Sequence, residues 1–170
     1  MSSKRPMIET FERKRIDPHR LYGVVVAESA ELLLIHQVDD FQCDGYAIVR
    51  QRDVSSRTSG KSNAYCERVM RREGLWLPVP RWVRSLPLED WERLLRALIG
   101  RVAIVENERQ DDYCIGPVLG LEQRRVWIHY FDSCGKLGEV DRFRLNRLTR
   151  VKIATRYSDV HGRHLTPPWP

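Results

Sequence analysis

Paired cysteines are missing from this sequence. The four cysteines lie far apart, at Cys43, Cys66, Cys114 and Cys134, and no two of them form a Cys-x-x-Cys motif. A zinc ribbon or a thioredoxin-like site requires such close pairs, and a disulfide scaffold needs a higher density of cysteine. The sequence therefore predicts four free thiols in a reducing compartment.

Long apolar runs are missing too. No segment of the 170 residues approaches the roughly 18 apolar residues that are needed to cross a bilayer. The N-terminal segment MSSKRPMIETFERKR carries basic residues, but no apolar block follows it, as it would in a secretory signal. These absences predict a cytoplasmic protein with no membrane partner.

The common catalytic motifs are absent as well. There is no Gly-x-Ser-x-Gly elbow, no dinucleotide-binding glycine pattern and no His-Glu-x-x-His helix. The triplet Gly60-Lys61-Ser62 matches the end of a phosphate-binding loop, but Ser55 stands where that loop requires a glycine. We therefore expect a non-enzymatic protein with no catalytic residues and no cofactor.

Metal-ligand patterns are weak. Asp159, His161 and His164 form the only compact set that could hold zinc, and no matching cysteine or histidine pair lies near them in the sequence. The aspartates around Asp40 do not have the spacing of a calcium loop, and turn formation explains them better. We expect no metal site.

Lysine is scarce, although the chain is basic. Only five of the 29 basic residues are lysines, so 24 are arginines, and the net charge is +6 with a pI of about 9.4. Arginine suits planar, bidentate contacts with phosphate or carboxylate. A modest positive excess permits contact with nucleic acid without requiring it, and a genome rich in G and C would also favour arginine.

The hydrophobic pattern that is present predicts a mainly β protein with little helix. Alternating or continuous apolar runs predict strands, and two amphipathic segments with capping residues and a terminal glycine predict helices. Prolines at 78, 80 and 87 predict an extended connector between these helices. The expected strands are 21–29, 31–40, 44–54, 101–108, 111–123, 124–132 and 138–157, and the expected helices are 62–74 and 88–100.

Two stretches of the first half recur in the second half. VVVAES (24–29) resembles VAIVEN (102–107), and the series Tyr46, Ile48, Arg50 resembles Phe143, Leu145, Arg147. A unit of four or five short strands with tight turns suits a small barrel. The sequence therefore predicts two tandem SH3-like or Sm-like β-barrel units, at 1–75 and 99–170, joined by a proline-rich connector and one amphipathic helix at 76–98. Whether the two units close separately or share strands stays open at this point.

Residues 21–75 also resemble a group of uncharacterised bacterial proteins. The resemblance is carried by Gly23-Val24-Val25, Glu31-Leu32-Leu33-Leu34, Asp44-Gly45-Tyr46, Arg50 and Asp53-Val54, which follow the pattern G-V-V, S-x-E-L-L-L, D-G-Y and R-x-x-D-V. It implies a bacterial origin and carries no activity. It is compatible with a distant relation to Sm-like RNA-binding barrels, but no RNA-contacting motif of those proteins is matched.

Two sets of residues are candidate sites. Arg50 and Asp53 at the end of a strand predict a structural ion pair, with Asp44 and Glu28 as other possible partners of Arg50 and a ligand or nucleic-acid contact as the alternative role. Arginines mixed with aromatic residues predict a face for single-stranded nucleic acid, with RNA before DNA, although a half-exposed strand gives the same alternation. The members of this second set are Arg124, Arg125, Trp127, Tyr130, Arg142, Arg144 and Arg150.

The sequence therefore leaves two functions open. The first is a binding module with a protein partner, or one that associates with itself through sheet edges or the aromatic connector. The second is RNA binding through the arginine-rich strands of the second half. Binding that weakens steeply with salt would distinguish the second from the first.

Overall fold

The computed structural model describes residues 7–168. In this range the strands are β1 (Glu9–Arg13), β2 (Asp17–Glu28), β3 (Leu32–Asp39), β4 (Gln42–Arg50), β5 (Ser56–Thr58), β6 (Val102–Asn107), β7 (Asp112–Glu122), β8 (Arg125–Phe131), β9 (Leu137–Arg144) and β10 (Arg150–Ile153). The helices are α1 (Lys61–Arg72), α2 (Arg81–Arg84), α3 (Trp91–Ala97) and α4 (Arg156–Gly162), and the 3-10 turns are η1 (Gln51–Asp53), η2 (Glu108–Gln110) and η3 (Leu145–Arg147). With 47% strand and 24% helix the chain is mainly β, which confirms the expectation from the sequence.

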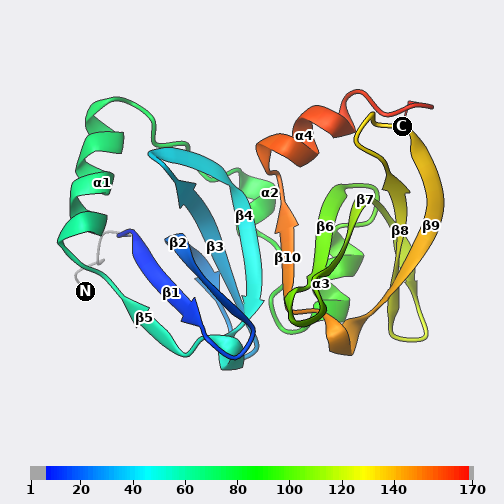
Figure 1. Cartoon of the computed structure of the whole chain (residues 1–170), viewed down its shortest axis with the longest axis horizontal. Coiled ribbons are helices and arrows are strands. Elements are labelled where there is room, and N and C mark those ends of the chain that lie inside the picture. Colours follow the sequence, from blue (N-terminus) through cyan, green and yellow to red (C-terminus); the bar gives the residue numbers. More distant parts are fainter. Residues whose placement is uncertain (1–6, 169–170) are drawn as a thin grey trace.

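The strands form one open antiparallel sheet that runs through both halves of the chain. Its order is β5-β1-β2-β3-β4-β10-β6-β7-β8-β9, so β4 of the first half pairs directly with β10 of the second (Figure 1). Val151 pairs with Ile48, and Ile153 pairs with Tyr46. All four side chains are buried. Burial of this apolar surface joins the two halves into a continuous sheet.

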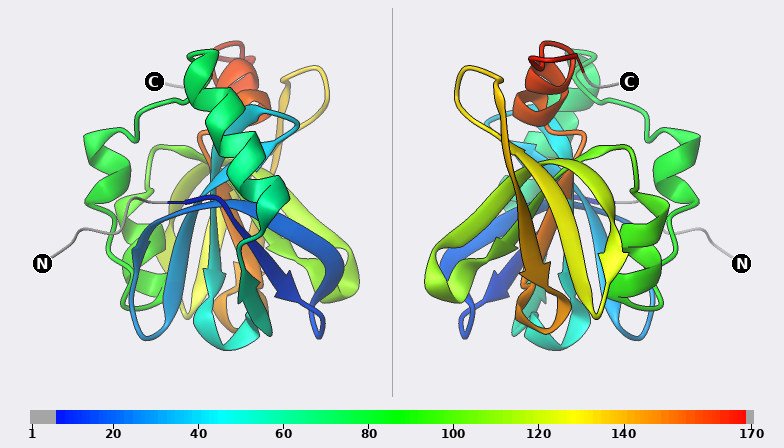
Figure 2. Two further views of the ribbon diagram at one scale, coloured as in Figure 1. Left: turned by 90° about the vertical axis from the view of Figure 1, so that its left-hand side faces the viewer. Right: turned by 90° about the vertical axis from the view of Figure 1, so that its right-hand side faces the viewer.

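The main core lies on one face of this sheet, under α2 and α3. Leu94, Leu95 and Leu98 of the second predicted helix pack there against residues of both halves. The helix begins later than the sequence suggests, because the side chain of Asp90 accepts a hydrogen bond from the backbone N–H of Arg93 and so caps it. Figure 2 shows α2 and α3 together on one side of the molecule.

Helix α1 covers the first half of the sheet. Its Met70 is buried with Ile8, Val24 and Val38 in a smaller core, and Figure 2 shows the helix lying across this half. The helix ends before Gly74, as predicted, and Gly74 takes a φ of 68° that favours glycine. Among the described residues, no helix has the length and apolar character that a bilayer span requires.

Several segments differ from the sequence-based expectation. Helix α2 forms within the connector that we expected to be extended, because the three prolines flank its four residues instead of lying among them. Strands β1 and β5 form where we expected no strand. Helix α4 begins at the end of the strand expected over 138–157, and that strand is itself divided. The division falls at η3, where Leu145 and Leu148 are both buried. Strict alternation cannot bury two residues three positions apart on one face, so the backbone turns between them. As a result β9 lies at the edge of the sheet and β10 at its centre.

The two halves have matching strand orders. The first half is ordered β5-β1-β2-β3-β4 and the second β10-β6-β7-β8-β9, so each half places its last strand beside its first. A 3-10 turn, η1 or η3, precedes the last strand in both halves. This order gives β7, and not β6, the position that β2 holds. Arg50 directly precedes η1, and the residue that directly precedes η3 is Arg144, not Arg147. The register of the repeat that we predicted from VVVAES and VAIVEN is therefore wrong.

Local irregularities also match between the halves. The ladder between the second and third strands shifts register between Val25 and Ala27 in β2, and between Val118 and Gly120 in β7. Gly23 packs against the carbonyl of His36, and Gly116 packs against the carbonyl of His129. A Cβ atom at these two glycines would lie 2.2 and 1.9 Å from the two carbonyl oxygens.

Candidate functional site

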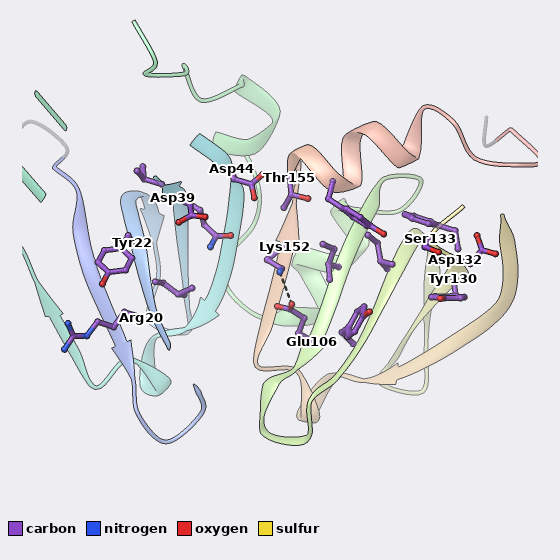
Figure 3. A pocket seen from close by; sticks show the side chains of 18 residues that line it. Arg20, Tyr22, Asp39, Asp44, Glu106, Tyr130, Asp132, Ser133, Lys152 and Thr155 are labelled. Carbon is purple, nitrogen blue, oxygen red and sulfur yellow. Dashed lines mark ion pairs between the residues drawn. The ribbon is translucent and has the colours of Figure 1, made fainter. Parts of the chain in front are cut away.

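A cleft of about 640 Å³ lies where the two halves of the sheet meet (Figure 3). Lys152 and Glu106 lie near its centre, between Arg20, Tyr22 and Asp39 of the first half and residues of the second half that include Tyr130. Four tyrosines from separate elements line it, and each is exposed. They are Tyr22 of β2 (43%), Tyr113 of β7 (65%), Tyr130 of β8 (37%) and Tyr157 of α4 (50%).

Strand alternation and one helix cap place these tyrosines. In β2, Leu21 and Gly23 are buried, so Tyr22 between them faces outward. Tyr157 lies in the first turn of α4, which Thr155 caps by accepting a hydrogen bond from the backbone N–H of Ser158. The Tyr157 ring packs on His161, with 4.4 Å between the ring centroids. Tyr22 and Tyr157 are thereby placed among the residues that line the cleft.

The lysine and the arginine that line the cleft each pair with a carboxylate. Nζ of Lys152 lies 3.0 Å from Oε1 of Glu106, and Nη2 of Arg20 lies 2.9 Å from Oε1 of Glu12. Asp39, Asp44 and Asp132 also line the cleft. These three aspartates give it an excess of negative charge.

Two of the three aspartates are fixed by the backbone. Oδ1 of Asp132 accepts hydrogen bonds from the N–H groups of Lys136 and Cys134, at 3.0 and 2.8 Å, and these bonds lower the pKa of the Asp132 carboxyl. Oδ1 of Asp44 accepts a hydrogen bond from the backbone N–H of Arg156 at 2.8 Å. The lowered pKa keeps Asp132 ionised at neutral pH.

A charge cluster links the cleft to the first half of the chain. Its three cations and three carboxylates are Arg13, Arg150, Lys152, Asp17, Glu106 and Glu108. Arg13 is fully buried, and its two terminal nitrogens donate to Glu108 at 2.5 and 2.7 Å. Burial alone would lower the pKa of Arg150, but the hydrogen bond to Glu106 and the charges of Glu106 and Glu108 raise it.

Four of the seven predicted nucleic-acid residues lie on the β8–β9 hairpin, and a fifth, Arg124, lies next to them in the turn between β7 and β8. Arg125 pairs with Arg144 across the ladder, and Trp127 pairs with Arg142. The guanidinium carbon of Arg142 lies 4.3 Å from the centroid of the Trp127 ring. Arg124 precedes them in the turn, where it is exposed. We name these five residues the basic face.

The other two predicted residues lie elsewhere. Tyr130 lines the cleft, beyond the register shift between His129 and Phe131. Arg150 belongs to the charge cluster, where it binds Glu106 and Glu108. The division of the predicted strand at η3 explains the position of Arg150, because β10 does not neighbour β9.

Arg50 and Asp53 each have a different partner from the one predicted. The guanidinium of Arg50 donates to the backbone carbonyls of Leu148 and Leu145, at 2.5 and 3.0 Å. Asp53 lies 3.8 Å from a terminal nitrogen of Arg109. Arg50 therefore joins the first half to the η3 turn of the second through carbonyl oxygens, and burial lowers its pKa.

The described residues contain no group of three or more histidines, cysteines, aspartates or glutamates placed to hold a metal ion. Sequence reasoning found the basic face but missed the cleft, whose tyrosines are scattered over positions 22 to 157. The exposed position of Tyr22 between Leu21 and Gly23 was the available signal. Comparison with protein-family models, curated proteins and solved structures finds no match.

Proposed function

We propose that this protein is a non-enzymatic binding module that holds a segment of a partner protein in the cleft. The observation that carries this proposal is the set of four exposed tyrosines around one hollow. Tyrosine supplies rigid contact area together with a hydroxyl group, and it is enriched where proteins bind one another. The cleft is concave and includes residues of both halves, as binding sites at such junctions commonly do.

We also propose that the two halves are copies of one SH3-like or Sm-like unit. The matching strand orders, 3-10 turns, register shifts and close-packed glycines support this relation. A single small unit buries little apolar surface. Two units that share a sheet bury more, and the cleft forms where they meet.

The sheet edges favour a partner protein over self-association. The edge strand β5 is short and polar, with the sequence Ser-Arg-Thr. The other edge strand, β9, carries Glu139, Asp141 and Arg142 as exposed side chains. Short or charged edges of this kind discourage pairing with a second sheet.

This function can be tested by selecting, from a random peptide display library, peptides that bind the intact protein. We expect the selected peptides to lose about tenfold in affinity for the Tyr113→Ser variant, since exposed tyrosines that contact a partner are common hot spots. The measurement is fluorescence polarisation of the synthesised peptides. Tyr65→Ser is the matched control, because Tyr65 is 53% exposed on α1 and outside the cleft. Selected peptides that bind Tyr113→Ser and Tyr22→Ser as tightly as the wild type would contradict the proposal.

A second candidate function is RNA binding on the basic face. It is favoured by Arg125, Arg142 and Arg144, which surround Trp127 on neighbouring strands. Guanidinium groups beside an aromatic ring are the usual elements of a single-strand site.

Short single-stranded RNA in a polarisation assay tests this candidate. We expect binding at low salt, a log–log salt slope of about −2 for three phosphate contacts, and a loss of more than about tenfold in the Arg142→Glu, Arg144→Glu double variant. The Arg93→Glu, Arg96→Glu variant on α3 carries the same change of charge and should bind RNA nearly as the wild type does. Absence of binding at low salt excludes this function.

A further inference from the structure

We propose that the segment held in the cleft is cationic, with lysine or arginine side chains that enter between the tyrosines. This inference rests on the proposed function and specifies the chemistry of the partner. The carboxylates Asp39, Asp44 and Asp132 supply the charge, and the faces of Tyr22, Tyr113, Tyr130 and Tyr157 supply the aromatic surface.

The charge balance of the cleft supports a cation. Lys152 and Arg20 are engaged by Glu106 and Glu12, so their charges are offset within the protein. Asp39 and Asp44 also line an adjoining hollow of about 620 Å³. The negatively charged surface of the cleft therefore extends into the adjoining hollow.

Few cations oppose this negative surface. In the adjoining hollow, Asp40 adds a third carboxylate, and Arg156 is its one arginine. The chain as a whole carries a charge of +6, which repels a basic peptide at long range. Binding of a basic segment therefore has to come from local contacts in the cleft.

No cation of the described residues lies over the rings of the four cleft tyrosines, although Tyr157 packs against the ring of His161. Within residues 7–168, cation–ring contacts occupy other aromatic groups, among them Trp82 under Arg101 and Trp76 under Arg71, and none of them uses the four cleft tyrosines. A lysine or arginine over a tyrosine ring gains most where carboxylates lie nearby and water is partly excluded. The cleft supplies the carboxylates, and the same aspartates would repel a phosphate group.

Three matched peptides test the inference on the intact protein. In the first, lysines alternate with serines; in the second and third, glutamine or glutamate replaces every lysine. We expect the lysine peptide to bind in fluorescence polarisation, the glutamine peptide to bind at least about tenfold more weakly, and the glutamate peptide not to bind. Added NaCl should weaken the lysine peptide, because salt screens these charges.

Variants locate the binding in the cleft. Asp39→Asn with Asp132→Asn should weaken the lysine peptide about three- to tenfold. The amide oxygen that Asp132→Asn introduces can still accept the turn hydrogen bonds, so the fold is kept. Tyr113→Leu should cost about two- to fivefold, whereas Tyr113→Phe, which keeps the ring, should bind as the wild type does. Glu89→Gln with Glu92→Gln removes the same charge at α3, outside the cleft, and should change little.

The outcomes separate this inference from the proposed function. If library peptides bind the cleft but the glutamine peptide binds as tightly as the lysine peptide, the function stands and the cationic partner is excluded. Lysine-peptide binding that is unchanged by the cleft variants also overturns the inference. Displacement of the lysine peptide by single-stranded RNA that itself fails to bind Tyr113→Leu would assign the cleft to nucleic acid instead. If no library peptide contacts the cleft, both proposals fail.

Discussion

Replacement of Arg13 by alanine is expected to lower the free energy of unfolding by about 3–5 kcal/mol, because it leaves a buried carboxylate without its closest cation. Both terminal nitrogens of Arg13 donate to Glu108, and the side chain is fully buried. The charge cluster balances three cations with three carboxylates. Removal of one cation therefore leaves net negative charge in a region that water reaches poorly. Urea unfolding followed by circular dichroism at neutral pH measures the loss.

The neighbouring residue provides the control. The side chain of Lys14 is 73% exposed and pairs with Glu12 at 3.0 Å, so Lys14→Ala should change the stability by less than about 0.5 kcal/mol. A double variant, Arg13→Met with Glu108→Gln, removes both charges and should be more stable than Arg13→Ala. A loss below about 1 kcal/mol for Arg13→Ala would show that solvent or another cation compensates Glu108.

Local pattern was sufficient to predict most of the elements. The apolar stripe of Leu94, Leu95 and Leu98 predicted a helix that packs on the sheet, and these residues are buried in the main core. Helix α1 and its end before Gly74 follow from the same periodicity and from the terminal glycine, but the helix begins at Lys61, after Gly60, with no side-chain cap. The strands predicted over 31–40, 101–108, 111–123 and 124–132 lie within one residue of β3, β6, β7 and β8, because apolar alternation is a local property of the chain.

Long-range pairing was not available from local pattern. Arg13 lies in the run Phe-Glu-Arg-Lys-Arg, which reads as an exposed basic segment, but the side chain is buried by its partner Glu108 from η2. The sequence around Arg13 does not indicate that its partner is Glu108, which lies 95 positions further along the chain. The junction between β4 and β10 is of the same kind, since it depends on two strands that more than half of the chain separates.

The candidate sites show the same difference. Arg142 and Arg144 were correctly placed on one face because they lie two positions apart in one strand. Arg150 was assigned to that face only on the assumption of a straight strand, and η3 moves it to the charge cluster. The cleft joins tyrosines from both halves, so it exists only through the tertiary fold. A site built within one hairpin can be predicted from sequence, but a site between two halves requires the structure.

Gly116→Ala is expected to destabilise the protein by about 3 kcal/mol or more, because the added methyl group has no space. Its Cβ would lie 1.9 Å from the carbonyl oxygen of His129 and 2.7 Å from the carbonyl carbon. Both are backbone atoms of the paired strand β8, so no side-chain rotation can relieve the overlap. The strands must separate locally, which weakens the β7–β8 ladder. Thermal or urea unfolding measures the change.

Gly120 gives a control on the same strand. No atom lies within 4 Å of a Cβ built at Gly120, so Gly120→Ala should leave the fold intact and stabilise it by about 0.4–1 kcal/mol through a less flexible unfolded chain. Gly23→Ala should reproduce the loss at Gly116, because its Cβ would meet the carbonyl oxygen of His36 at 2.2 Å. If Gly116→Ala and Gly120→Ala have the same stability, the two strands do not approach each other closely in solution. A large loss at both Gly23 and Gly116 would indicate that both halves depend on the same close strand contact, as two copies of one unit should.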